Sequence, residues 1–368
     1  MSELSTDKEK LARAAQYLER NADLRRALEI PAGEELEPHF LGNGEHNENF
    51  WFESATTEKK YVLRINVAKQ AFHKDQIAYE YHALQTLQES GCVPTPRYLD
   101  SSEQAPAFGA LVEDFCVGEQ LNFDALRPGD LRCAAQLMAN IHAVQVPKNC
   151  EIFRPEDPLR ALFDECIERF NVYLASPYED AKLTRRMRAF IESTQDALES
   201  VRASCIHNDC TRIVNTETLP SHFLIPFASA SEAAKNSQTS GAFCENPGTF
   251  VDWERPVIGE VAQDLAYFVA PTTTFWDSEF LFPKEQVQAF LEDYWRAVDG
   301  RFERGSFDSH FWAWFKLTAL RSQTWCCKAL LAYGENGSGY TTKKTADKLR
   351  IYLSDDFMDF VAKECFEL

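Results

Sequence analysis

Two short segments of the chain carry aspartates in settings suited to catalysis. Residues 207–215 read HNDCTRIVN, and residues 250–254 read FVDWE. In the first segment, Asp209 is a candidate base that orients an attacking hydroxyl; in the second, Asp252 is a candidate magnesium ligand. Both tasks belong to phosphoryl transfer, in which a protein mainly positions the reactants and neutralises phosphate charge. Together the two segments predict a kinase-like reaction.

Each aspartate also has a purely structural interpretation. Asp209 alone would be read as a turn residue that caps a backbone amide, and Asp252 as a surface carboxylate at a strand end. The combination favours chemistry, because Asp252 follows an apolar pair and would therefore project from a rigid element. Glu254 is a further candidate metal ligand, directly or through water. Asp264, at the start of a later helix, is expected to cap or brace the first loop.

Two arginines are candidates for binding phosphate. Arg64 lies in the strand-like run 60–65 (KYVLRI), on the same face as Val62, after a glycine-containing turn. Glu80, in the helix pattern that follows, can pair with Arg64 and hold it in place. A lone arginine on a strand is usually solvated, so this assignment depends on its context. Arg212, inside the first loop, is a second candidate, for the transferring phosphoryl group.

The periodicity of apolar residues predicts a small α+β lobe followed by a mainly helical one. The first lobe has a helix, a hairpin, a third strand, a second helix and a further strand, at 5–29, 40–52, 60–65, 74–90 and 107–116. The second lobe has a short strand at 213–219 and helices at 130–145, 156–176, 180–203, 260–270, 284–299, 308–333 and 342–364. Residues 220–247 are rich in Ser, Ala, Asn and Pro and are expected to be a mobile insertion.

From about residue 35 to about residue 340, the chain resembles the aminoglycoside phosphotransferase and choline kinase-like family. The strongest elements of the resemblance are His207-Asn208-Asp209, Val251-Asp252-Trp253-Glu254, Gly259 and Asp264-Leu265-Ala266. The resemblance implies an α+β, two-lobed protein-kinase-like fold, with a nucleotide-binding lobe at 1–116 and a catalytic and acceptor-binding lobe at 117–368. It also implies ATP or GTP as phosphoryl donor, Mg²⁺ as cofactor, and a nucleotide base held by hinge backbone around Glu113 and Phe115.

The first loop departs from the family pattern at one position. The family carries an asparagine, the second metal ligand, five residues after the catalytic aspartate; here Val214 stands there, and Asn215 follows one residue later. A one-residue bulge would bring Asn215 to the metal; otherwise the second metal site is altered or lost. The loop at Gly42 and Gly44, implied to cover the nucleotide, also lacks the full glycine pattern of protein kinases. The alternative function is therefore a catalytically impaired, nucleotide-binding pseudokinase or scaffold module.

The composition limits the class of partner. With 38 Lys+Arg against 57 Asp+Glu, the formal net charge is −19, which argues against nucleic acid and anionic membranes. The acidic surface suits solubility and also a cationic substrate. Aromatic residues such as Trp276 and Trp325 either contact an amine or belong to the core. We expect the acceptor to be a small, hydroxylated or amine-bearing metabolite, and the oligomeric state stays open.

The polar N-terminus and the lack of a long apolar stretch predict a cytoplasmic protein, and this location in turn predicts free thiols. The N-terminus has no apolar signal-peptide region, and no stretch reaches the roughly 18 apolar residues that a membrane span needs. The 11 cysteines form no C-x-x-C pair and no zinc-spaced cluster, so free thiols are expected.

Overall fold

The N-terminal part of the chain forms an antiparallel five-stranded sheet in the order β1-β2-β3-β5-β4. Its strands are β1 (His39–Asn43), β2 (Asn47–Ser54), β3 (Lys59–Asn66), β4 (Pro96–Asp100) and β5 (Ala110–Asp114). The computed structural model describes residues 7–44, 46–68, 75–102, 105–205, 211–226, 244, 246–333 and 343–368. The predicted hairpin and two further strands are present, and β4 is an additional edge strand.

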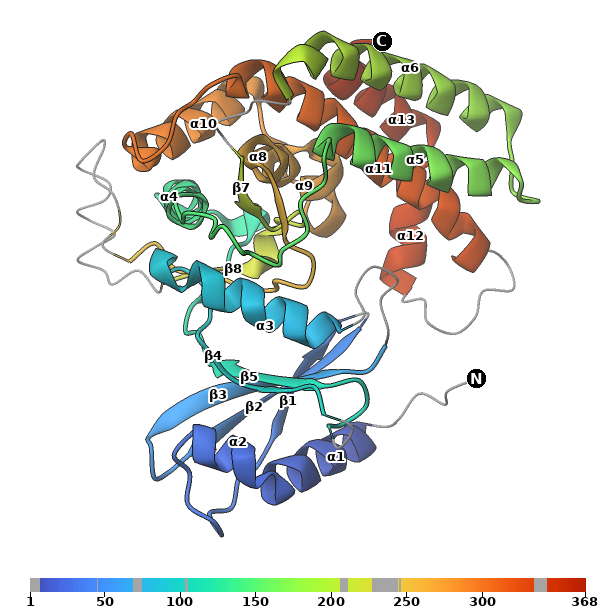
Figure 1. The fold of residues 1–368 in the computed structure, drawn as a ribbon. Coiled ribbons are helices and arrows are strands. Elements are labelled where there is room, and N and C mark those ends of the chain that lie inside the picture. Colours follow the sequence, from blue (N-terminus) through green and yellow to red (C-terminus); the bar gives the residue numbers. More distant parts are fainter. Residues whose placement is uncertain are drawn as a thin grey trace.

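The two faces of this sheet have different neighbours. Strand alternation places Phe50, Leu63 and Val112 on one face, in a core with the helices α1 (Asp7–Arg20) and α2 (Ala22–Ala27). Arg64 pairs with Leu111, and Val62 pairs with Glu113, so these side chains share the opposite face. Figure 1 shows α1 and α2 on one side of the sheet, and α3 (Gln76–Leu87) on the other, between the sheet and the larger lobe.

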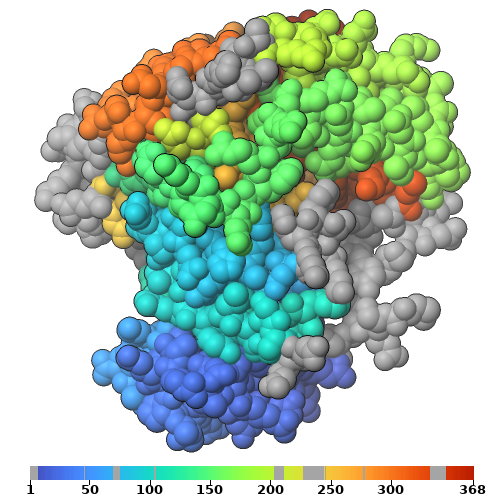
Figure 2. Space-filling view, in the orientation of Figure 1, coloured from blue at the N-terminus to red at the C-terminus, as the bar shows by residue number. Residues whose placement is uncertain are grey.

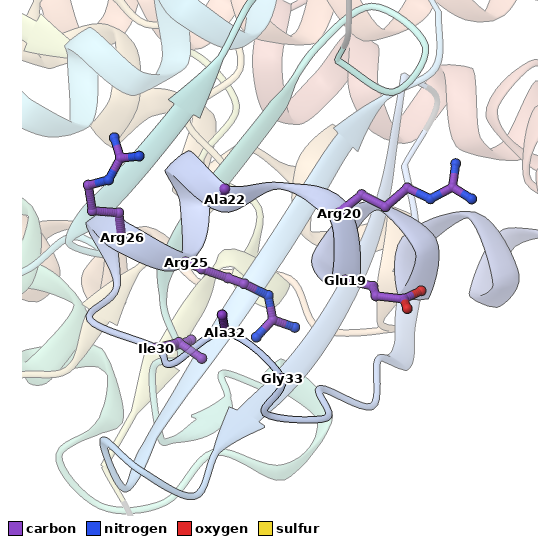
Figure 3. A pocket seen from close by; sticks show the side chains of 8 residues that line it. All are labelled: Glu19, Arg20, Ala22, Arg25, Arg26, Ile30, Ala32 and Gly33. Atoms are coloured by element: carbon purple, nitrogen blue, oxygen red, sulfur yellow. The ribbon is translucent and has the colours of Figure 1, made fainter.

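The single helix predicted at 5–29 is two helices. Asn21 interrupts it, because its side-chain oxygen accepts a hydrogen bond from Leu24 N at 2.9 Å and so caps α2. The following turn closes around Arg25, which donates to three backbone carbonyls. Figure 3 shows Arg25 among the residues of a cavity of about 270 Å³ beside these helices. Since its donors satisfy the turn, we assign Arg25 a structural role.

The larger lobe is mainly helical, as predicted. Its helices are α4 (Asp130–His142), α5 (Pro158–Leu174), α6 (Ala181–Cys205), α8 (Val261–Val269), α9 (Pro271–Asp277), α10 (Lys284–Val298), α11 (Phe307–Tyr333), α12 (Lys343–Tyr352) and α13 (Asp355–Val361). Short 3₁₀ turns lie at Gln88–Ser90, Phe123–Ala125 and Pro220–His222, and a π-helical turn at Ala362–Phe366. Helix α11 packs against α5, α6 and α8 and so forms the centre of this lobe. Among the described helices, none is both long and apolar enough to cross a bilayer.

Among the described residues of the larger lobe, five short strands line the side that carries the polar loops. They are β6 (Glu119–Gln120), β7 (Thr211–Val214), β8 (Phe223–Ile225), β9 (Thr249–Phe250) and β10 (Val257–Glu260). Strand β7 pairs with β10, and β8 lies between β6 and β9. The strand predicted at 213–219 therefore ends at Val214, and the polar residues after it form a loop. Figure 2 shows the blue N-terminal lobe at one end and the green-to-red helices at the other.

Two of the cysteines form a disulfide, contrary to the expectation of free thiols. Cys133 in α4 is bonded to Cys244, which lies 111 residues further along the chain. The amide of Gln136, one turn after Cys133, exchanges two hydrogen bonds of 2.8 Å with the backbone of Cys244. Such a pairing depends on tertiary packing, so cysteine spacing alone does not reveal it. Seven other cysteines of the described residues are free thiols.

Candidate active site

Arg64 joins the two lobes through ion pairs. Its Nη2 atom lies 3.0 Å from Oε1 of Glu80 in α3. The same atom lies 3.1 Å from Asp252 Oδ1 and 3.4 Å from Glu254 Oε1, both in the larger lobe. Only 8% of the Arg64 side chain is exposed. The predicted pair of Arg64 with Glu80 is therefore present, and the carboxylates of the second predicted segment converge on the same guanidinium.

Negative charge exceeds positive charge around this guanidinium. The charge of Glu113 also raises the pKa of Arg64, so four carboxyl groups surround one arginine. Burial acts to lower the pKa of Arg64, but the four acidic groups together raise it by more than burial lowers it. Arg64 therefore stays charged. Burial raises the pKa of Glu80 despite its contact with Arg64. Because one guanidinium cannot neutralise four carboxylates, the cluster favours the uptake of protons or of a further cation.

The remaining carboxyl groups of the cluster differ in their affinity for protons. Burial raises the pKa of Glu113 to about 7, and burial together with the charge of Asp252 raises that of Glu254 to about 7. Burial is the largest influence on Asp252 and acts to raise its pKa, but the charges of Arg64 and His222 and the hydrogen bond from Arg64 together outweigh it, so the pKa lies below its ordinary value. Asp252 is thus the carboxylate of the cluster that is most readily available to a cation at neutral pH.

The backbone at Asp252 has an uncommon conformation that its surroundings maintain. Its φ is 67°, in the left-handed region that few residues with a side chain adopt. The Asn215 amide donates a 2.8 Å hydrogen bond to the Asp252 carbonyl. On the other side, the buried Trp253 donates from Nε1 to the carbonyl of Phe250 at 2.9 Å. These bonds orient the Asp252 carboxylate toward Arg64, and Trp253 serves packing.

Asp264 fixes the loop between β7 and β8. Its two carboxylate oxygens accept the backbone N–H groups of Asn215 and Thr216, each at 2.8 Å. Asp264 is fully buried, so these charge-assisted bonds hold the loop firmly. The next residue, Glu217, forms a 2.7 Å ion pair with Arg321 of α11. The predicted bracing role of Asp264 agrees with this geometry.

The end of the same loop reaches Asp252. Nε2 of His222 lies 3.4 Å from Asp252 Oδ2. Nδ1 of the same ring lies 3.0 Å from the backbone carbonyl of Glu217. Glu217 is also near enough to Glu254 for its charge to raise the pKa of that group. The loop 215–222 therefore brings an acid and an imidazole to the carboxylates around Arg64.

Glu254 receives hydrogen bonds from the N-terminal lobe. The side chain of Asn47 in β2 donates to its carboxylate, and that of Gln76 in α3 donates to its backbone carbonyl. The glycine loop also lies here, since a Cβ atom on Gly44 would be 3.8 Å from Glu254 Oε1. Gly42 belongs to β1 itself. Of the two predicted loop glycines, Gly44 is thus the one beside the acidic cluster.

Residues 38–212 match the model of the phosphotransferase enzyme family. Over these residues the chain is similar to members of that family. A search of curated proteins finds no sequence match. The predicted resemblance to aminoglycoside phosphotransferases is confirmed, and the family's description names the predicted class of enzyme.

Solved structures of this group share the fold. A candidate aminoglycoside phosphotransferase from Ralstonia eutropha JMP134 aligns over 93% of this chain and 96% of its own, with 14% identity and a TM-score of 0.64. Spectinomycin phosphotransferase, in complex with ADP and spectinomycin, aligns over 91% and 95%, with 12% identity and a TM-score of 0.60. Plasmodium vivax ethanolamine kinase aligns over 96% of both chains, with 14% identity and a TM-score of 0.57. The predicted two-lobed, protein-kinase-like α+β fold is confirmed.

The hinge expected to hold a nucleotide base follows β5. The N–H of Phe115 already donates to the carbonyl of Lys60 at 3.1 Å, and that of Asp114 donates to Thr95 at 2.9 Å. The side chain of Glu113, which is 6% exposed, lies on the Arg64 face of the sheet. Of the two residues that the family resemblance suggests, Phe115 has its amide engaged within the protein, while Glu113 contributes charge to the site.

Three further residues were predicted for the site, namely Asp209, Arg212 and Asn215. Asp209 lies outside the described residues. Arg212 belongs to β7, where its guanidinium stacks over Phe302 at 4.6 Å, and Arg64 is the arginine that contacts Asp252. The side-chain amide of Asn215 donates to the backbone carbonyl of Asp252, and the side-chain oxygen of Asn215 accepts a hydrogen bond from Glu217 N at 3.0 Å. Its role as a metal ligand stays a prediction.

Glu217, His222 and Arg321 are residues that the sequence interpretation missed. A usable signal was present, because the polar run 215–222 lies between two apolar strands, β7 and β8. What the sequence does not display is the pairing of β8 with β9, which brings the end of this run next to Asp252.

Proposed function

We propose that this protein transfers the γ-phosphoryl group of ATP or GTP to a hydroxyl of a small, amine-bearing metabolite. The observation that carries the proposal is the position of Arg64, which contacts Glu80 of the small lobe and Asp252 of the large lobe within 3.1 Å. A cation for the phosphates and a carboxylate for a metal ion thus meet where the lobes join, as phosphoryl transfer requires.

The proposed division of labour follows the two lobes. Residues 1–116 would bind the nucleotide, with Arg64 on its phosphates and the loop at Gly44 beside them. Residues 117–368 would supply the catalytic loop and the acceptor site. A hinge after β5 would join the two, near the close approach of Gly118 to the backbone of Leu224.

The acidic cluster fits a divalent cation. Four carboxyl groups share one guanidinium, and Asp252 is the one whose pKa is lowered. Asp252, with Glu254 beside it, would hold Mg²⁺, and a cation there would neutralise charge on the transferring phosphoryl group. The protein's own part is to fix Asp252, through Asn215 and the turn at φ 67°.

Two carboxylates are candidates for the base that orients the acceptor hydroxyl. Asp209 is suggested by the resemblance. Glu217 is favoured by the structure, since Asp264 anchors the two residues before it and Arg321 orients its side chain, which is 41% exposed. We therefore assign the base to Glu217.

An amine-bearing acceptor is supported by the net charge of −19 and by the acceptors of the relatives, spectinomycin and ethanolamine. The aromatic residues give weaker support. Trp314 is fully buried and donates to Glu260, which makes it part of the core. Trp276 and Trp325 meet edge to face, with ring centroids 5.5 Å apart.

The test has two stages. Thermal shift with ATP, GTP and their diphosphates, with and without Mg²⁺, identifies the donor, because a ligand of the folded state raises the midpoint. Amino alcohols and amino sugars are then screened for acceptor-dependent release of ADP or GDP. Nucleotide binding without transfer to any acceptor would favour the alternative, a nucleotide-binding module without turnover.

The base is tested with matched amides. Glu217→Gln should lower turnover by about 10²- to 10⁴-fold and leave nucleotide binding unchanged, because general-base catalysis contributes about that much. Glu285→Gln, on the exposed side of α10, is the control. If Asp209→Asn abolished turnover while Glu217→Gln did not, the base would be Asp209.

A further inference from the structure

The hydrogen bonds of His222 leave one ring nitrogen directed at Asp252. Nδ1 lies 3.0 Å from the backbone carbonyl of Glu217. Since a carbonyl can only accept, Nδ1 carries the proton of that bond. When the ring is neutral, Nε2 is therefore an acceptor, and it points at another acceptor, Asp252 Oδ2, at 3.4 Å. Two lone-pair atoms at this distance repel each other unless a positive charge lies between them, and that charge is either a proton on Nε2 or a metal ion.

The surrounding residues hold this pair of atoms in place. The loop that carries His222 is anchored by Asp264, and Asp252 is held by the amide of Asn215. An imidazole that donates one N–H to a backbone carbonyl and directs the other nitrogen outward is the usual arrangement of a metal-binding histidine. Only 14% of the His222 side chain is exposed.

We propose that His222 Nε2 and Asp252 Oδ2 together bind the divalent cation of the nucleotide complex, and that the imidazole makes the site select a first-row transition metal ion over Mg²⁺. Mg²⁺ prefers an all-oxygen octahedron, whereas imidazole nitrogen favours transition metals. The inference depends on the proposed function, because the nucleotide supplies the remaining ligands. Within the described residues, no group of three or more His, Cys, Asp and Glu side chains is placed to hold a metal ion by itself.

The experiment uses the full chain with ADP, and Mn²⁺ as the probe. Pulsed electron paramagnetic resonance of the Mn²⁺–ADP complex should show coupling to a ¹⁴N nucleus of the protein. The signal of free Mn²⁺ measures its affinity, and Mg²⁺ is added as competitor, with ADP alone as reference. We expect the protein to increase the preference for Mn²⁺ over Mg²⁺ by at least about tenfold compared with ADP alone. A change of this size is typical when a metal site gains or loses one interacting residue.

His222→Asn tests the ligand directly, since it replaces the nitrogen donor by an amide oxygen. The variant should lose the ¹⁴N coupling and the preference for Mn²⁺, while ADP–Mg²⁺ still binds. His82→Asn, at an exposed histidine of α3, is the control and should retain both.

The possible outcomes separate the two proposals. If ADP binds but wild-type protein shows no ¹⁴N coupling, or if His222→Asn retains it, the histidine ligand is refuted and the proposed function is not. If ADP does not bind in the presence of either Mn²⁺ or Mg²⁺, both the histidine ligand and the proposed function are refuted. The wild-type spectrum decides the matter even if the variant does not fold, because it requires no substitution.

Discussion

Replacement of Asp264 by asparagine tests whether this residue holds the catalytic loop. Asp264 accepts two backbone N–H groups, one on each oxygen, at 2.8 Å, and lies 3.3 Å from Nε2 of His142. Asparagine keeps one acceptor oxygen and places an NH₂ group where the second was. One buried N–H, of Asn215 or Thr216, then faces another donor and has no acceptor.

The expected loss of stability follows from these bonds. A hydrogen bond to a charged acceptor contributes about 1.5–3 kcal/mol, and a buried donor left unsatisfied costs about 1–3 kcal/mol. Asp264→Asn should therefore lower the free energy of unfolding by about 3–5 kcal/mol. Urea-induced unfolding, followed by tryptophan fluorescence, measures the change.

A matched control separates this effect from loss of a carboxylate as such. Asp157 caps α5 and accepts a single backbone N–H, that of Arg160, at 3.0 Å. Asparagine caps helices about as well as aspartate, so Asp157→Asn should change stability little. If Asp264→Asn costs less than about 1 kcal/mol, or no more than the control, the two bonds of Asp264 do not anchor the loop as argued.

Two further predictions concern the charges of the site. Burial raises the pKa of Glu113 to about 7, so its contribution to stability is present below the pKa of the unfolded chain and is lost as the pH rises to about 7, by about 3 kcal/mol. Glu113→Gln should remove this dependence on pH. In urea titrations, the effect of the substitution on the free energy of unfolding should be about 3 kcal/mol more favourable at pH 8 than at pH 4, and an effect independent of pH would contradict the burial argument. Arg64→Met should weaken ADP binding by at least about tenfold in calorimetric titration, since it removes the cation assigned to the phosphates. An unchanged affinity would exclude Arg64 from the phosphate site.

Much of the site on the small lobe could be predicted because its determinants are local. The alternation of strand β3 places Arg64 opposite the core face, and the next helix carries Glu80 within reach. The same local signals predicted most helices of the larger lobe. Where they failed, the cause was a side chain with a specific partner, as with Asn21, whose cap divides the first helix.

The residues of the large lobe were harder to predict, because their contacts depend on distant pairing. Cys133 and Cys244 are brought together over 111 residues by the bonds of Gln136. Likewise, His222 meets Asp252 only because β8 pairs with β9. No periodicity in a single segment records either contact.

The departure of the first loop from the family pattern acquires a different meaning from this geometry. The resemblance requires an acid followed five residues later by a metal ligand, and residues 209–215 miss that spacing by one. Glu217 and His222 meet it, with a longer acid in place of aspartate and an imidazole in place of an amide. The contacts of the loop agree, since Asp264 binds the two residues before Glu217, and His222 faces Asp252. On this interpretation the second metal ligand is present but altered in kind, so metal selectivity is the property in which this protein should differ most from its relatives.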